Sequence, residues 1–249
     1  MFCKNCATFF YNCYGCGAVV LQFAAFGLVA YAAKNRYISA MKLFFASGNR
    51  HKQAEVAKLF PQHEVLIPAD IGIDFDPEEN GSSFVENSLI KAKALYEIVK
   101  VPVIADDSGI CVDALNGAPG IFSARYAGID DPAGKNHGEK LTSPERNRLL
   151  LEHVEKTFAK SNDSNKQRSC RFVCAMVLYL GSDRFYAVQE TIEGELVNDI
   201  KSAEGVNGFG YDPIFYLPQY GKTVAQLSDE EKNAISHRGK AAKKIAELL

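Results

Sequence analysis

Val101-Pro-Val-Ile-Ala-Asp-Asp-Ser-Gly109 is the stretch that decides the fold. Its apolar half, bounded by Pro102, is too short for a helix and predicts a buried strand. Gly109 predicts a sharp turn where that strand ends. We therefore expect Asp106 and Asp107 at the carboxyl end of a core strand, which is where open α/β sheets bind ligands.

The two adjacent aspartates need an explanation of their own. Neighbouring carboxylates repel each other, and burying them is costly unless a cation or hydrogen bonds offset the charge. An Asp-Ser-Gly turn explains one acid, because such a turn uses a single aspartate. The presence of a second aspartate favours a metal site over an Asp-Ser-Gly turn with no ligand. Both interpretations stay open at this point.

Composition narrows the class of protein. The 249 residues can bury a large core in one or two lobes, and 47% hydrophobic with 23% charged residues is typical of a soluble globular protein. A formal net charge of -2 gives no general attraction to nucleic acid or to anionic membranes, so we expect neither as a partner. Cys111, Cys170 and Cys174 lie in apolar, strand-like contexts and predict reduced core thiols in a cytoplasmic protein.

Residues 1–40 differ from the rest of the chain. They hold two C-x-x-C pairs, which are typical of zinc sites, but the spacing between the pairs is shorter than in a zinc ribbon. The apolar residues 18–33 are too few for a comfortable membrane span and follow no basic segment. Because Met41 opens a strand and the later motifs need nothing before it, we predict an extension over 1–40 and one domain over 41–249.

A strand, a glycine turn and a helix are predicted from Lys42 to Phe60. Such an arrangement presents free N–H groups and a positive dipole to an anion, and Lys52 can reach that anion as a point charge. The alternative is that Asn49 is a helix N-cap and Lys52 a solvated charge. The candidate phosphate-binding residues are Ser47, Gly48, Asn49, Arg50, His51 and Lys52.

An acidic loop over 70–81 precedes the next helix. Ser83 and Glu86 predict a capping box at the start of this helix, and apolar residues at helical spacing continue up to Lys100. The cap is a sufficient structural role for Glu86. Glu79 has no such role, so it is the better candidate metal ligand, although a solvated acidic loop is the ordinary alternative.

The second half of the chain predicts more strand and helix. Residues 110–115 predict a strand, 145–158 an amphipathic helix, and 171–180 with 184–193 a hairpin. Ser228 and Glu231 form a second capping box. Ser236-His-Arg238 then interrupts the helix, and a terminal helix is expected from Gly239.

Two clusters near the end of the chain are candidates for a nucleotide. Residues 205–213 are rich in glycine, and the rings of Phe209 and Tyr211 offer a stacking face for a base. The alternative is that these two aromatic side chains simply pack into the hydrophobic core beneath a glycine-rich loop. His237 and Arg238, with Lys232 one turn earlier, form a donor cluster suited to a carbonyl oxygen or a phosphate.

The motifs, taken in order, resemble those of the inosine/xanthosine triphosphate pyrophosphatases of the RdgB type. The resemblance covers Met41 to Leu249. It rests on Ser47-Gly-Asn-x-x-Lys52, Phe84-x-Glu-Asn87, Ala105-Asp-Asp-Ser-Gly109, Gly117-Ala-Pro-Gly120, Ser123-Ala-Arg-Tyr126, Gly208-Phe-Gly-Tyr-Asp-Pro213, Glu231-Lys-Asn233 and Ser236-His-Arg238.

This resemblance implies an α/β fold with a mixed central sheet flanked by helices, two lobes around a substrate cleft, and a homodimer. It implies hydrolysis of ITP, dITP and XTP to the monophosphate and pyrophosphate with Mg²⁺. In this sequence Glu79 and Asp107 would hold the metal, and Asp107 would also accept the proton. Residues 47–52 would hold the triphosphate. The other implied substrate contacts are Ser108, Phe209, Gly210, Tyr211, Asp212, Lys232, His237 and Arg238.

Two rival functions stay open. A Maf-type nucleotide pyrophosphatase shares a related fold and chemistry, but Ser236-His-Arg238 argues against it. A non-catalytic nucleotide-binding module would need the lysine and the aromatic loop but not Glu79 together with two aspartates. Release of pyrophosphate from ITP, with and without magnesium, distinguishes an enzyme from a binding module.

Overall fold

The computed structural model describes residues 42–128, 131–132, 134, 141–161 and 167–249. The two cysteine pairs, the apolar stretch over 18–33 and Met41 lie outside the described residues. The zinc alternative therefore stays untested, and the extension stays a prediction. Within the described part, no helix combines the length and the apolar content that a membrane span requires.

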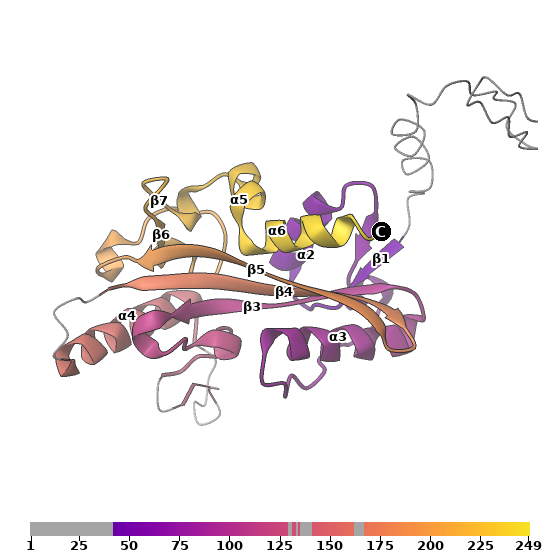
Figure 1. Cartoon of the computed structure of the whole chain (residues 1–249), viewed down its shortest axis with the longest axis horizontal. Helices are drawn as coiled ribbons and strands as arrows, with labels where there is room; N and C mark the ends of the chain where they lie inside the picture. The colour runs from indigo at the N-terminus through magenta and orange to yellow at the C-terminus, as the bar shows by residue number, and fades with distance from the viewer. Residues whose placement is uncertain (1–41, 129–130, 133, 135–140, 162–166) are drawn as a thin grey trace, which may run out of the picture. The chain divides into compact units, whose positions relative to one another are not determined.

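A seven-stranded sheet forms the centre of the described domain, in the order β2-β1-β3-β4-β5-β6-β7 (Figure 1). β1 is parallel to β2 and β3, and the remaining neighbours are antiparallel. The predicted mixed sheet is thus confirmed. The strands are β1 (Lys42–Phe45), β2 (Glu64–Leu66), β3 (Val103–Val112), β4 (Ser169–Gly181), β5 (Arg184–Leu196), β6 (Phe215–Leu217) and β7 (Lys222–Thr223).

Helices cover both faces of this sheet. α2, α5 and α6 lie on one face, and α3 and α4 lie on the other (Figure 1). The helices are α2 (Arg50–Leu59), α3 (Phe84–Val99), α4 (Ser143–Lys160), α5 (Asp229–Ile235) and α6 (His237–Ala246). Short 3-10 helices occupy Pro68–Ile71, Asp113–Leu115, Gly120–Phe122, Ile200–Ser202, Asp212–Ile214 and Val224–Gln226.

The hydrophobic core gathers at the two ends of the long central strands, which matches the expected two lobes. At one end, α4 and β6 pack on the carboxyl half of β3. At the other end, α2 and α6 pack on one face of the sheet and α3 packs on the opposite face. Because β3, β4 and β5 run through both ends, the lobes share one continuous sheet.

Helix caps explain where the last helices begin. The Ser228 hydroxyl accepts a hydrogen bond from the Glu231 amide at 3.2 Å, so the predicted capping box is present. The Ser236 hydroxyl accepts from the Gly239 amide at 3.0 Å and caps α6. The terminal helix therefore begins at His237 rather than at Gly239, and His237 and Arg238 are held in its first turn.

The predicted turn after the two aspartates is wrong. β3 is one continuous strand of ten residues, and β4 pairs with it from Val103 to Val112. Gly109 serves close approach rather than a turn, because a Cβ there would lie 2.3 Å from the Gly120 carbonyl oxygen and from the Ser123 hydroxyl. The aspartates therefore lie in the middle of a strand.

Candidate active site

The candidate site lies along one edge of strand β3, which is left unpaired by the described strands beyond the end of β1. β1 pairs with β3 at Phe44↔Val103 and Phe45↔Ile104, where β1 ends. In the described part of the chain no further strand continues along this edge of β3. Side chains from both faces therefore reach one pocket of about 490 Å³, which is within the range of roughly 300–1,000 Å³ found for small-molecule sites.

Strand alternation sends Asp106 and Asp107 to opposite faces of the sheet. Asp106 is buried and accepts from the Lys52 ammonium at 3.1 Å. It also accepts from Nε and Nη2 of Arg238 at 3.1 and 3.0 Å. Burial alone would raise the pKa of Asp106, but the charges of Lys52 and Arg238 outweigh it and hold that pKa well below its usual value. The two acids therefore do not form one metal site.

Asp107 lies against α3 on the other face. It accepts from the Asn87 amide at 3.2 Å and from the Ser108 backbone N–H at 3.0 Å. Burial raises the pKa of Asp107, and the nearby Glu79 adds to that rise, while Lys91 opposes it. A carboxylate with a raised pKa binds a proton more readily than an ordinary aspartate, as a general base must.

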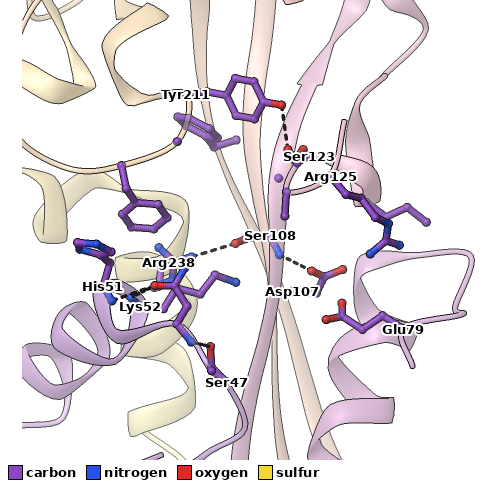
Figure 2. A pocket seen from close by; sticks show the side chains of 18 of the residues that line it. Ser47, His51, Lys52, Glu79, Asp107, Ser108, Ser123, Arg125, Tyr211 and Arg238 are labelled. Atoms are coloured by element: carbon purple, nitrogen blue, oxygen red, sulfur yellow. Dashed lines mark hydrogen bonds between the residues drawn. The ribbon is translucent and has the colours of Figure 1, made fainter. Parts of the chain in front are cut away.

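Lys91 joins Asp107 to the acidic loop. Its ammonium lies 3.0 Å from a Glu79 carboxylate oxygen and 3.6 Å from an Asp107 carboxylate oxygen. Figure 2 shows both acids on the same side of β3 and directed toward one another. The part of the chain that the structure describes holds no set of three or more metal-ligating side chains. Two carboxylates nevertheless fit Mg²⁺, which commonly takes one or two from the protein and its other ligands from water and substrate phosphates.

The loop after β1 lines the pocket and begins α2. The Asn49 side chain accepts from the backbone N–H groups of His51 and Lys52 at 2.9 and 3.2 Å, so Asn49 is the N-cap of α2, which begins at Arg50. Arg50 differs from its neighbours, because it forms an exposed ion pair with Asp70 and does not line the pocket.

Cations surround the ring of Phe209 at the opposite end of the pocket. The Lys232 ammonium lies 5.0 Å and the Arg238 guanidinium carbon 5.8 Å from the ring centroid. The His51 ring stacks on Phe209 with centroids 5.7 Å apart. This end of the pocket therefore combines an aromatic face with hydrogen-bond donors.

Glu55 holds these cations in place. Its carboxylate lies 2.6 Å from the Lys232 ammonium and 2.5 Å from Nη1 of Arg238. Burial would raise the pKa of Glu55, but the charges of Arg238 and Lys232 lower it overall. Asp212 completes the frame by accepting from Lys232 at 2.9 Å and from the Phe209 backbone N–H at 2.8 Å.

His237 is buried between this frame and the sheet. Its ring stacks on Phe172 with centroids 5.0 Å apart, and its Nδ1 has no hydrogen-bond partner among the described residues. Burial, followed by the charges of Arg238 and Lys232, lowers the pKa of His237 well below the usual value. The imidazole is therefore neutral at physiological pH and keeps one nitrogen as a donor and the other as an acceptor.

A model of the Ham1 family matches residues 43–248. The chain belongs to the Ham1 family. It is 49% identical over 209 residues to the dITP/XTP pyrophosphatase of Treponema denticola, covering 84% of this chain and 98% of the relative. Its identity to the dITP/XTP pyrophosphatase of Treponema pallidum is 47%, over 84% of this chain and 71% of the relative. The solved structure of a HAM1 protein from Coxiella burnetii matches with a TM-score of 0.69 and 37% identity, covering 84% of this chain and 98% of that one.

Most sequence-predicted residues meet in the pocket of this Ham1 family member. Arg50 is the predicted site residue that does not line it. Tyr211 lines it, but its hydroxyl donates to the Ser123 carbonyl oxygen at 2.9 Å and so anchors the glycine loop to the segment after β3. The pocket contains Ser47, Gly48, Asn49, His51, Lys52, Glu79, Asp107, Ser108, Phe209, Gly210, Tyr211, Asp212, Lys232, His237 and Arg238.

Three residues that organise this Ham1 site were not predicted from the sequence. Lys91 and Asn87 contact Asp107, and Glu55 joins the two cations beside Phe209. A signal existed for two of them, because Asn87 and Lys91 are polar residues four apart on one face of a largely apolar helix. Glu55 follows Lys52 by three residues on α2, but that spacing is also typical of an ordinary surface ion pair.

Proposed function

We propose that this chain hydrolyses the non-standard purine nucleoside triphosphates ITP, dITP and XTP to the monophosphate and pyrophosphate. The observation that carries the proposal is Asp107, a buried carboxylate with a raised pKa that faces Glu79 across Lys91. The same pocket holds the capped loop over 47–52 and the aromatic end at Phe209. The names of the two Treponema relatives support the same activity.

In the proposed reaction, water attacks the α-phosphorus and Asp107 accepts its proton. Asn87 and the Ser108 N–H orient the Asp107 carboxylate for this role. Lys52 and Lys91 approach from opposite faces of β3 and neutralise charge on the phosphate oxygens. The residues over 47–52 position the triphosphate.

Glu79 and Asp107 are the residues that would hold Mg²⁺. Bound there, the cation would polarise phosphate oxygens and offset the charge of the leaving pyrophosphate. Lys91 lies between the two acids and keeps them close before a cation binds. Because metal ligation reduces the basicity of a carboxylate, the two roles of Asp107 oppose one another.

We assign recognition of the purine base to the end of the pocket that contains Phe209. The neutral His237 ring and the Arg238 guanidinium present donors to a 6-oxo group, whereas a 6-amino group would leave them unpaired. Each buried donor left unpaired costs about 1–3 kcal/mol. Phe209 offers an aromatic face to the purine.

The central test is pyrophosphate release from ITP by the purified chain, measured with and without magnesium. We expect release that requires a divalent cation and that is far slower with ATP, because ATP lacks the 6-oxo group. A Maf-type enzyme would show another base preference, and a binding module would bind ITP without releasing pyrophosphate. Failure to release pyrophosphate from ITP, dITP and XTP at saturating magnesium would refute the proposal.

The domain boundary gives a second test. We propose that residues 41–249 carry the activity and that 1–40 are an extension. A chain beginning at Met41 should hydrolyse ITP with the kcat/KM of the full chain. A loss of activity or aggregation of the shorter chain would show that the first forty residues belong to the fold.

Assembly and location follow from the sequence predictions. We propose a homodimer in the cytoplasm. The molar mass in solution, measured by light scattering, decides between a monomer and a dimer, and fractionation of cells decides the location.

A further inference from the structure

Arg125 lines the pocket, and the reaction proposed above gives it no role. It lies in the segment Ser123-Ala-Arg-Tyr126, just after the 3-10 helix Gly120–Phe122, and is half-buried. Its guanidinium carbon lies 5.3 Å from the ring centroid of Phe122, and this contact orients the planar group. In Figure 2 the guanidinium is directed toward the side of the pocket that holds Asp107 and Glu79.

The charge of Arg125 is uncommitted within the described residues. No described carboxylate pairs with it, and no described side chain accepts a hydrogen bond from its guanidinium. Arg146, the other pocket arginine without a described carboxylate partner, donates instead to the Leu141 carbonyl oxygen and the Ser143 hydroxyl. The remaining pocket cations are all paired: Lys52 with Asp106, Lys91 with Glu79, Lys232 with Glu55 and Asp212, and Arg238 with Asp106 and Glu55.

A triphosphate brings more negative charge than these paired cations can neutralise without losing their own partners. The uncommitted guanidinium is therefore the group best placed to meet it. Figure 2 shows His51 and Arg238, at the aromatic end, on one side of β3, and Arg125 on the other side with Asp107 and Glu79. A base beside Phe209 therefore directs the phosphate chain toward Arg125.

We propose that Arg125 binds the pyrophosphate half of the triphosphate and stabilises its departure. The inference rests on the proposed function. As water attacks, the bond from the α-phosphorus to the bridging oxygen breaks, that oxygen keeps the electron pair, and the water proton passes to Asp107. A guanidinium donates two parallel hydrogen bonds to phosphate oxygens, a geometry that a lysine ammonium cannot reproduce.

Product inhibition by pyrophosphate and by inosine monophosphate tests whether Arg125 contacts the pyrophosphate half of the substrate and not the nucleotide half. Arg125→Ala should weaken inhibition by pyrophosphate about 10- to 100-fold, the worth of a lost charged hydrogen bond, and lower kcat/KM for ITP by a similar factor. Inhibition by inosine monophosphate should stay within about 2-fold of wild type, because Arg125 does not contact that half. Arg125→Lys should recover part of the pyrophosphate affinity, and added guanidinium ion should partly restore turnover of Arg125→Ala.

Arg148→Ala is the matched control, because Arg148 is an exposed arginine of α4 that does not line the pocket. It should behave as wild type in every assay.

Two results in Arg125→Ala overturn the inference: equal weakening of inhibition by pyrophosphate and by inosine monophosphate, or pyrophosphate inhibition as strong as in wild type. If Arg125→Ala fails to fold, judged by its thermal melting, the same comparison on Arg125→Lys and Arg125→Gln decides. A wild-type chain that releases no pyrophosphate from ITP refutes the proposed function itself, whereas an active wild type with an unaffected Arg125→Ala refutes the role of Arg125 alone.

Discussion

Asp107→Asn is expected to reduce turnover of ITP by about 10²- to 10⁴-fold, the range lost with a general base. Asp107 is also one of the two carboxylates proposed to hold Mg²⁺, and the loss of that ligand should add to this effect. The fold should survive, because asparagine has nearly the same shape and its single side-chain oxygen can still accept one of the two hydrogen bonds that Asp107 receives from Asn87 and the Ser108 N–H. Steady-state kinetics with ITP at saturating magnesium, together with thermal melting, measure both outcomes.

The matched control for this substitution is Asp113→Asn. Asp113 follows the same strand but forms a partly exposed ion pair with Arg171, away from the pocket. Its replacement should leave kcat and KM close to wild type. Near-normal turnover in Asp107→Asn would remove Asp107 from the chemistry and would leave the proposed mechanism without a base.

The stretch around the two aspartates shows how far the sequence could be interpreted. Its apolar start predicted a buried strand, and β3 begins there. A glycine after two acids is also typical of a turn, and nothing local distinguishes that from a strand whose glycine is required by a distant contact. The distant contact is the approach of Gly120 and Ser123 to Gly109, which depends on tertiary packing. The turn was therefore predicted wrongly although the strand was predicted correctly.

The alternation of side chains along β3 also changes the interpretation of Asp106 and Asp107. Two adjacent carboxylates suggested one metal site, but in a continuous strand adjacent side chains point to opposite faces. Asp106 thus became the partner of Lys52 and Arg238, and Asp107 the partner of Lys91. Ion pairs between residues more than 50 positions apart leave no local pattern, which is why Asp106 had no predicted partner.

Arg238→Ala is expected to lower the free energy of unfolding by about 3–5 kcal/mol, because removing one member of a buried ion pair leaves the other charge without its partner. Arg238 is 2% exposed, and its guanidinium bonds to Asp106, Glu55 and the Ser108 hydroxyl. Urea denaturation followed by circular dichroism measures the loss.

A second substitution tests the cause of this loss. Adding Asp106→Asn to Arg238→Ala should recover part of the stability, because an amide in place of Asp106 no longer needs a counter-ion. Arg171→Ala is the control, since its pair with Asp113 is partly exposed and should contribute no more than about 1 kcal/mol. A loss within 1 kcal/mol in Arg238→Ala, or no recovery in the double variant, would contradict the structural role.

The same variant decides whether Arg238 also selects the base. Of its five N–H groups, four are engaged by Asp106, Glu55 and Ser108, so one on Nη1 is left for a 6-oxo group. The ratio of kcat/KM for ITP over ATP, measured on one preparation, does not depend on how much of that preparation is folded. We expect Arg238→Ala to reduce this ratio about 10- to 100-fold, because ATP never used that donor. Lys52→Ala should slow both substrates alike, because phosphates carry no base identity. An unchanged ratio in Arg238→Ala would make Arg238 purely structural and would assign base selection to His237 and the pocket around Phe209.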